Sequence, residues 1–184
     1  MPKNYIGSCE KHPNINCRDW GIVPRKVIKM PKKILFVCHG NICRSPMAEF
    51  VMKDIVRKAG LENEILVDSK ACRTDEIGSD TYYGTKDKLR KEGIPFTPRQ
   101  ARQITLADYD KYDYIIGMDS ENMRDLARLT KGDPKAKTHR LLELAGENRD
   151  VADPWYTDDF DATYRDVTKG CAALLKSLTV KLSS

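Results

Sequence analysis

The segment VCHGNICRSP, residues 37–46, constrains the fold of this chain more than any other part of it. It joins an apolar run over residues 34–37 to a helical pattern through a short loop that begins with Cys38 and ends with Arg44. In such a loop the backbone amides can point inward, and the N-terminus of the next helix adds partial positive charge, which together suit a tetrahedral oxyanion. The same field favours the thiolate form of Cys38. A thiolate inside an anion-binding loop predicts phosphoryl transfer to sulfur.

The residue types within the loop agree with this interpretation. Gly40 and Asn41 can adopt the positive φ that a tight anion-binding loop requires. Ser45 can hydrogen-bond the thiolate, and Pro46 falls in the first helical turn, where its missing N–H costs nothing. The alternative is a buried Cys at a strand end beside an unrelated Arg. The predicted phosphate-binding loop comprises His39, Gly40, Asn41, Ile42, Cys43, Arg44 and Ser45.

Strand and helix patterns alternate from residue 33 onward. Strands are expected at 34–38, 65–68, 114–118 and 140–144, and helices at 47–59, 79–92, 120–129, with Ser120 as its cap, and 164–178. This alternation predicts an α/β fold: a doubly wound, flavodoxin-like, four-stranded parallel sheet with helices on both faces. In such a sheet the loops at the carboxyl ends of the strands build the site, which is where the Cys38 loop falls.

Composition favours one domain without a membrane span. At 184 residues the chain is long enough for one full core. It has no run of about 18 apolar residues and no apolar signal-peptide core near its start. The net charge of +5 comes from interspersed acids and bases, without a basic tract alternating with aromatics. We therefore expect neither a nucleic acid nor a membrane as partner.

The cysteines indicate a reducing compartment. Six of them at irregular spacing in a chain of this size favour free thiols over a disulfide framework, so a cytoplasmic protein is expected. No cofactor is expected. Cys9, His12 and Cys17 lack the fourth ligand and the spacing of a zinc site, so no metal is expected either. Residues 1–30 show no sustained periodicity and are predicted to be an N-terminal extension to a domain over residues 31–184. A genuine extension, a start upstream of the natural one and an artificial segment all remain open.

Several motifs, taken in order, resemble the low-molecular-weight protein tyrosine phosphatases, whose signature loop runs C-x-G-N-x-C-R-S-P. The likeness runs from residue 33 to about residue 178. It is carried by VDS at 67–69, EIG at 76–78, ARQI at 101–104, GMD at 117–119 and DPWY at 153–156. The resemblance implies a hydrolase that removes phosphate from tyrosine-phosphorylated proteins through a phosphocysteine intermediate.

Three residues are expected to carry that chemistry. Cys38 attacks phosphorus, and the Arg44 guanidinium binds two phosphate oxygens in a bidentate manner. The resemblance places the acid at Asp153, which would protonate the leaving oxygen and then activate the water that hydrolyses the phosphocysteine. Without the resemblance, Asp153 and Pro154 would indicate only a turn.

The resemblance extends to the surroundings of these residues. Trp155 and Tyr156 would line a slot for a phenyl ring, with ordinary core packing as the alternative. Cys43 is implied as a redox partner that traps an oxidised Cys38 as a reversible disulfide.

Other residues that match the family are expected to have structural roles. Asn41 and Ser69 match residues that hold the loop in shape, and Asp119 matches a structural Asp without a chemical role. His39 occupies a variable position and is not expected to be a base.

Substrate preference is indicated by Ile42, because relatives that dephosphorylate arginine carry Thr there. Phosphotyrosine is therefore favoured over the alternative of a protein-arginine phosphatase. Arg73 and Asp75 predict a charged rim where the family often has an aromatic residue. An arsenate reductase on the same fold is the other alternative, but Cys72 and Cys171 do not form the close pair that a disulfide relay would need. The oligomeric state and the physiological substrate are not readable from the sequence.

Overall fold

The structure of the protein is a computed structural model, which describes residues 30–182, with side chains to residue 179. The predicted extension therefore lies outside the described residues except for Met30, as do Cys9, His12 and Cys17. None of the described helices is long and apolar enough to cross a membrane.

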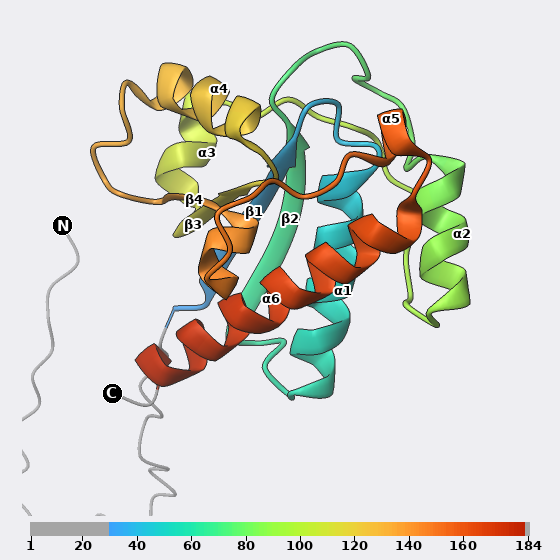
Figure 1. The fold of residues 1–184 in the computed structure, drawn as a ribbon. Coiled ribbons are helices and arrows are strands. Elements are labelled where there is room, and N and C mark those ends of the chain that lie inside the picture. Colours follow the sequence, from blue (N-terminus) through green and yellow to red (C-terminus); the bar gives the residue numbers. More distant parts are fainter. Residues whose placement is uncertain (1–29, 183–184) are drawn as a thin grey trace, which may run out of the picture. The chain divides into compact units, whose positions relative to one another are not determined.

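Four parallel strands form one sheet in the order β2-β1-β3-β4 (Figure 1). They are β1 (Lys32–Cys38), β2 (Ile65–Ala71), β3 (Tyr114–Gly117) and β4 (Thr138–Arg140). β1 lies between β2 and β3, with Cys38 opposite Ala71 and Val37 opposite Gly117. The chain order reverses across β1, so a crevice opens at its carboxyl end. This confirms the predicted four-stranded parallel sheet.

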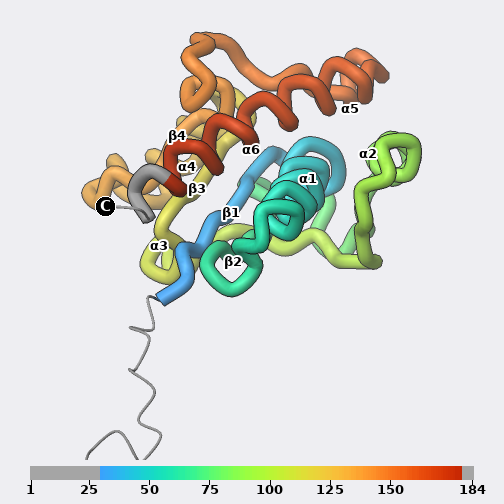
Figure 2. Tube along the Cα trace, turned by 90° about the horizontal axis from the view of Figure 1, so that it is seen from below, coloured from blue at the N-terminus to red at the C-terminus, as the bar shows by residue number. Residues whose placement is uncertain are grey.

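Helices cover both faces of the sheet. The long helices α1 and α6 pack against each other on one face, and α3 and α4 lie on the other (Figures 1 and 2). The helical elements are α1 (Arg44–Lys58), α2 (Tyr83–Lys91), α3 (Leu106–Lys111), α4 (Ser120–Thr130), the 3-10 helix η2 (Leu141–Ala145), α5 (Pro154–Thr157) and α6 (Phe160–Leu182).

The alternation of side chains along β1 supplies both halves of the core. Ile34 and Phe36 are fully buried and belong to the cluster under α1 and α6, whereas Leu35 and Val37 belong to the cluster under α3 and α4. Each such side chain contributes about 1.5–3 kcal/mol relative to an exposed position. Because strand side chains alternate, Cys38 leaves the strand on the same face as Phe36, beside α1.

The strand expected at 65–68 and the helix expected at 164–178 are shorter than β2 and α6, and two further elements differ because local contacts override periodicity. The strand predicted at 140–144 is β4 at 138–140, and the apolar residues Leu141 and Leu142 turn into η2 and are buried beneath α6. The helix predicted from residue 79 begins only at Tyr83. The Asp80 side chain accepts from Thr81 N at 2.6 Å, and residues 79–82 are irregular.

Two helix starts also differ from expectation. The cap of α4 is Asp119 and not Ser120: the Asp119 side chain accepts from Asn122 N at 2.6 Å. α3 was not predicted, although Thr105 and Asp108 form a capping box at its start.

Candidate active site

The phosphate-binding loop predicted from the sequence lies at the carboxyl end of β1, at the point where the sheet order reverses. β1 ends at Cys38 and α1 begins at Arg44. Cys38 is 3% exposed, and its Sγ lies 3.0 Å from Ser45 Oγ at the start of α1. The loop opens into a cavity of about 660 Å³ whose lining includes Cys38, His39, Gly40, Ile42, Cys43, Arg44, Asp119, Asp153, Trp155 and Tyr156.

The backbone of the loop is shaped by two residues with different requirements. Asn41 has φ 60°, a left-handed conformation that Asn tolerates better than most residues. Gly40 does not have a positive φ; instead, a Cβ there would lie 2.9 Å from Glu76 Cγ, so its smallness lets the segment after β2 pass close by. Within the described chain, no backbone N–H of residues 39–43 donates to a backbone carbonyl. These amides are therefore available to an anion in the loop.

Arg44 lies between two carboxylates. Its Nη1 donates to Asp119 Oδ2 and its Nη2 lies against Asp153 Oδ2, both at 2.5 Å, and its side chain is only 5% exposed. Burial alone would lower the pKa of the guanidinium, but the negative charges of Cys38, Asp153 and Asp119 raise it above its ordinary value. Arg44 thus remains a fixed positive charge facing the floor of the cavity.

Asp153 reaches Arg44 because the two residues before it are hydrogen-bonded to neighbouring elements. Val151 N donates to Met118 O at the end of β3, and Thr163 of α6 donates to Ala152 O at 2.9 Å. Asp153 is also the N-cap of α5, accepting from Trp155 N at 3.0 Å, which orients its carboxylate.

Trp155 and Tyr156 line the cavity as expected, but they are not core residues. They are 58% and 85% exposed and stand at its mouth. Trp155 makes an edge contact with the Tyr82 ring, with centroids 5.7 Å apart, and Ile42 lies nearby in the small cluster that contains Tyr82. One wall of the mouth is therefore aromatic and aliphatic.

Cys43 is a buried residue of the loop itself. Burial, followed by the negative charges of Cys38 and Asp153, raises the pKa of the Cys43 thiol to about 12. The other described thiols do not line the cavity: Cys72 N donates to Cys38 O, but the Cys72 side chain packs with the α3 and α4 cluster on the opposite face of the sheet, and Cys171 is fully buried in α6. Cys43 is consequently a protonated thiol near Cys38.

The rim of the cavity is charged, as expected from Arg73 and Asp75, but the two side chains bind different partners. Asp75 lies 3.0 Å from His39 Nε2 and lines the cavity. Arg73 instead binds Asp125 of α4 at 2.7 Å, away from the cavity lining. His39 is an exposed rim residue.

Sequence reasoning missed two contacts of the loop. Asp119 has a structural role, as expected, but its contact with Arg44 was not foreseen; its position just after a strand was the available signal. Arg99 was not singled out, yet its guanidinium donates to Asn41. Among residues 30–182, no cluster of His, Cys, Asp or Glu is placed to hold a metal ion.

Fold and site together define an α/β protein that presents a cysteine thiol within an anion-binding loop, beside an arginine shared by two aspartates. The model of the family "Low molecular weight phosphotyrosine protein phosphatase" matches residues 33–184. The chain belongs to this family, which confirms the family indicated by the sequence motifs.

The chain is also similar to individual proteins and solved structures. The Bacillus subtilis low molecular weight protein-tyrosine-phosphatase YfkJ is 42% identical over 147 residues, covering 79% of this chain and 94% of the relative. Its crystal structure superimposes with a TM-score of 0.80 at 39% identity, covering 83% of this chain and 98% of that one. The low molecular weight protein tyrosine phosphatase of Streptococcus pyogenes gives 0.72 at 42% identity, with 80% and 93% covered. A Drosophila arginine phosphatase gives 0.71 at 29% identity, with 79% and 97% covered.

Proposed function

We propose that this protein is a cysteine-dependent protein tyrosine phosphatase whose phosphatase domain spans residues 31–184. One observation carries the proposal: Cys38, Arg44 and Asp153 face one cavity, with Arg44 2.5 Å from Asp153. A nucleophile, a fixed positive charge and a carboxyl group are the parts that phosphoryl transfer to sulfur requires.

The first step forms a phosphocysteine. Cys38 Sγ attacks phosphorus in line, and the bond from phosphorus to the tyrosyl oxygen breaks as the sulfur–phosphorus bond forms. Arg44 and the amides of the loop bind the equatorial oxygens, whose negative charge they stabilise in the transition state. Ser45 Oγ, 3.0 Å from the sulfur, stabilises the thiolate before attack and after its release.

Asp153 moves the proton in both steps. Its carboxyl group donates a proton to the departing phenolate oxygen, and the resulting carboxylate then accepts a proton from the water that attacks the phosphocysteine. Phosphate and the Cys38 thiolate are the products of the second step. α5 and Arg44 hold the Asp153 carboxyl group in one orientation. It can therefore donate a proton in the first step and accept one in the second step at the same position.

Phosphotyrosine is the substrate that the mouth of the cavity fits. Trp155 and Tyr156 offer flat surfaces to a phenyl ring, and Ile42 is aliphatic where arginine-directed relatives carry Thr. Arsenate reduction is disfavoured because the described thiols Cys72 and Cys171 pack on opposite faces of the sheet and so do not form the close pair that a disulfide relay would need. Four free described cysteines and a thiol nucleophile fit a cytoplasmic location and a tyrosine-phosphorylated protein as partner.

The test offers phosphotyrosine, phosphoarginine and arsenate to the purified protein and to its Cys38→Ser and Asp153→Ala variants. We expect turnover of phosphotyrosine only, and none in Cys38→Ser. In Asp153→Ala the rate should fall by about 10²–10⁴ for phosphotyrosine and much less for aryl phosphates with activated leaving groups. Equal loss across leaving groups would reject Asp153 as the acid, and thiol-coupled arsenate reduction would reject the phosphatase assignment.

A further inference from the structure

Arg99 is a nearly buried arginine that grips the phosphate-binding loop from behind. It lies in the irregular segment between α2 and α3, and its side chain is 10% exposed. Nη2 donates to Asn41 Oδ1 at 2.8 Å and to Ser69 O at 3.1 Å, and Nη1 donates to Asn41 O at 3.2 Å. One guanidinium therefore holds both the side-chain and the backbone carbonyl of Asn41, the loop residue with positive φ.

These contacts fix the direction of a hydrogen-bond chain that ends on the nucleophile. Arginine only donates, so the Asn41 atom that faces it must be the amide oxygen, and the Asn41 nitrogen must face the other way. That nitrogen donates to Ser45 Oγ and to Ser69 Oγ, both at 2.9 Å. Since Ser45 accepts from Asn41, the Ser45 hydroxyl proton is directed to Cys38 Sγ, 3.0 Å away.

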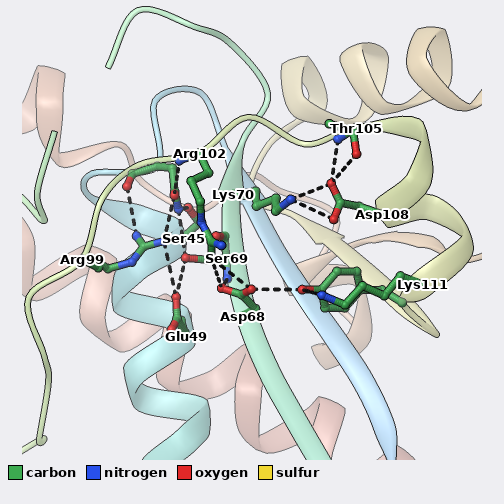
Figure 3. Close-up of polar contacts among 12 residues, drawn as sticks. Ser45, Glu49, Asp68, Ser69, Lys70, Arg99, Arg102, Thr105, Asp108 and Lys111 are labelled. Carbon is green, nitrogen blue, oxygen red and sulfur yellow. Dashed lines mark hydrogen bonds and ion pairs between the residues drawn. The ribbon is translucent and has the colours of Figure 1, made fainter. Parts of the chain in front are cut away.

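The other branch of the chain keeps the Arg99 charge compensated. Ser69 Oγ donates to Glu49 Oε2 at 2.6 Å, and the same oxygen lies 3.7 Å from Arg99 Nη2. Figure 3 shows Arg99, Ser69 and Glu49 converging behind Ser45, between the start of α1 and β2. A buried guanidinium with a carboxylate partner and three acceptors is held rigidly, which suits a residue that sets orientation.

We propose that Arg99 is a positioning residue for the nucleophile: by holding both carbonyl oxygens of Asn41 it directs the Ser45 hydroxyl toward Cys38. Arg99 does not line the cavity of about 660 Å³ and touches no reacting atom. The inference rests on the proposed function only in that Cys38 is taken as the nucleophile. Without Arg99, the Asn41 amide oxygen keeps only the 3.4 Å bond from Arg102 N, so the amide is held less firmly and the thiolate loses a well-directed donor.

The chain offers a matched control at Arg102. Arg99 and Arg102 line the same cavity of about 940 Å³ on the far side of the loop. The Arg102 side chain is 59% exposed and pairs with Asp68 at 3.3 Å, while only its backbone N–H reaches Asn41. Arg102→Met therefore removes one positive charge from the same surface without removing a side-chain contact to the loop.

The experiment compares Arg99→Met, Arg99→Lys and Arg102→Met with the wild-type protein. Alkylation of Cys38 by iodoacetamide is measured against pH by mass spectrometry of its peptide, beside kcat/KM for p-nitrophenyl phosphate and thermal unfolding. For Arg99→Met we expect the alkylation midpoint to rise by about one pH unit and kcat/KM to fall on the order of tenfold near pH 6. Arg99→Lys, which lacks the fork, should shift in the same direction by less, and Arg102→Met should match the wild type.

Several results would overturn the inference. An unshifted midpoint in a folded Arg99→Met protein would make Arg99 a purely structural residue, and an equal shift in Arg102→Met would make the effect one of general charge. If Arg99→Met does not fold, an unshifted midpoint in folded Arg99→Lys decides against the inference. A wild-type protein that fails to hydrolyse p-nitrophenyl phosphate contradicts the proposed function instead, because the alkylation midpoint requires no turnover.

Discussion

Arg44 places each terminal nitrogen of its guanidinium against a different carboxylate, Nη1 against Asp119 and Nη2 against Asp153. These aspartates follow β3 and precede α5, so one side chain ties the start of α1 to two segments that are distant in sequence. Asp119 also caps α4 through its other oxygen. The position of Arg44 is thus coupled to the N-termini of three helices, which restricts it to one geometry.

We expect Cys43 to act as a reserve thiol for Cys38. Its pKa of about 12 keeps it protonated while Cys38 is available for oxidation. Peroxide would convert the Cys38 thiolate to a sulfenic acid, and attack by the Cys43 sulfur would then form a disulfide and release water. We expect activity lost in hydrogen peroxide to return with a dithiol reductant in the wild type, but to remain lost in Cys43→Ser, where oxidation continues to the sulfinic acid.

The control for this prediction is Cys72→Ser, since Cys72 packs on the opposite face of the sheet. It should recover like the wild type, and mass spectrometry should find the peroxide-dependent disulfide between residues 38 and 43. Full recovery of Cys43→Ser would show that Cys43 does not protect the site.

Sequence reasoning could foresee contacts within the loop because they are local. Residues 38–45 are consecutive, and a Cys, an Asn and a Ser at these spacings can meet through loop and helix geometry alone. The contacts of Arg44 with Asp119 and of Arg99 with Asn41 join residues 75 and 58 positions apart. They depend on how β3 and the segment before α3 pass the loop, which no local pattern encodes.

At the scale of elements, the segments with a clear apolar pattern were predictable and those without one were not. β1 and α1 have apolar runs that admit one interpretation, and both form as expected. The segment after β4 contains the apolar residues Leu141 and Leu142, which suit a strand and a 3-10 helix equally well. It forms the 3-10 helix η2 because these residues pack against α6. α3 has only six residues, too few for a periodic signal.

The contact between α6 and η2 depends on a glycine. Gly170 is buried in α6, and a Cβ there would overlap the side chain of Leu141. Helix propensity alone would make Gly170→Ala stabilising by about 1 kcal/mol. We expect the overlap to outweigh this gain and to lower the free energy of unfolding by about 1–3 kcal/mol, measured by urea denaturation.

Ala172 provides the comparison on the same helix, because it is exposed. Ala172→Gly should cost about 1 kcal/mol from propensity without any change in packing. A Gly170→Ala protein as stable as the wild type, or more stable, would show that η2 adapts and that the close approach is not required.

At the scale of the whole molecule, a buried carboxylate limits stability at low pH and buried thiols limit it at high pH. Asp166 accepts two hydrogen bonds from Arg149, at 2.6 and 2.7 Å. Burial would raise the pKa of Asp166, but these bonds, with one from Ala152 N, lower it below its ordinary value of 3.8. At the other limit, burial raises the pKa values of Cys43, Cys72 and Cys171 above their ordinary value of 9.0.

The signs follow from proton linkage. A carboxylate whose pKa is lower in the folded protein binds fewer protons there than in the unfolded chain, so its stabilisation is present above about pH 4 and is lost as the pH falls. A thiol whose pKa is raised in the folded protein acts in the opposite way: its contribution is present below about pH 9 and declines as the pH rises. We expect the free energy of unfolding to be nearly constant between about pH 5 and 8 and to fall on both sides.

The Asp166→Asn variant tests the fall in the free energy of unfolding at low pH. The side chain is 10% exposed and its partner Arg149 is 51% exposed, so we expect a loss of about 1–2 kcal/mol at pH 7, because the charge-assisted bonds weaken without leaving a fully buried charge. The difference from the wild type should shrink as the pH falls from 5 to 3, where Asp166 of the wild type becomes protonated as well. Urea denaturation at each pH measures it, with Asp110→Asn as control, since its pair with Lys135 is exposed and screened by solvent. A difference between Asp166→Asn and the wild type that stays constant from pH 7 to pH 3 would mean that packing, and not the ionised carboxylate, is what the substitution removes.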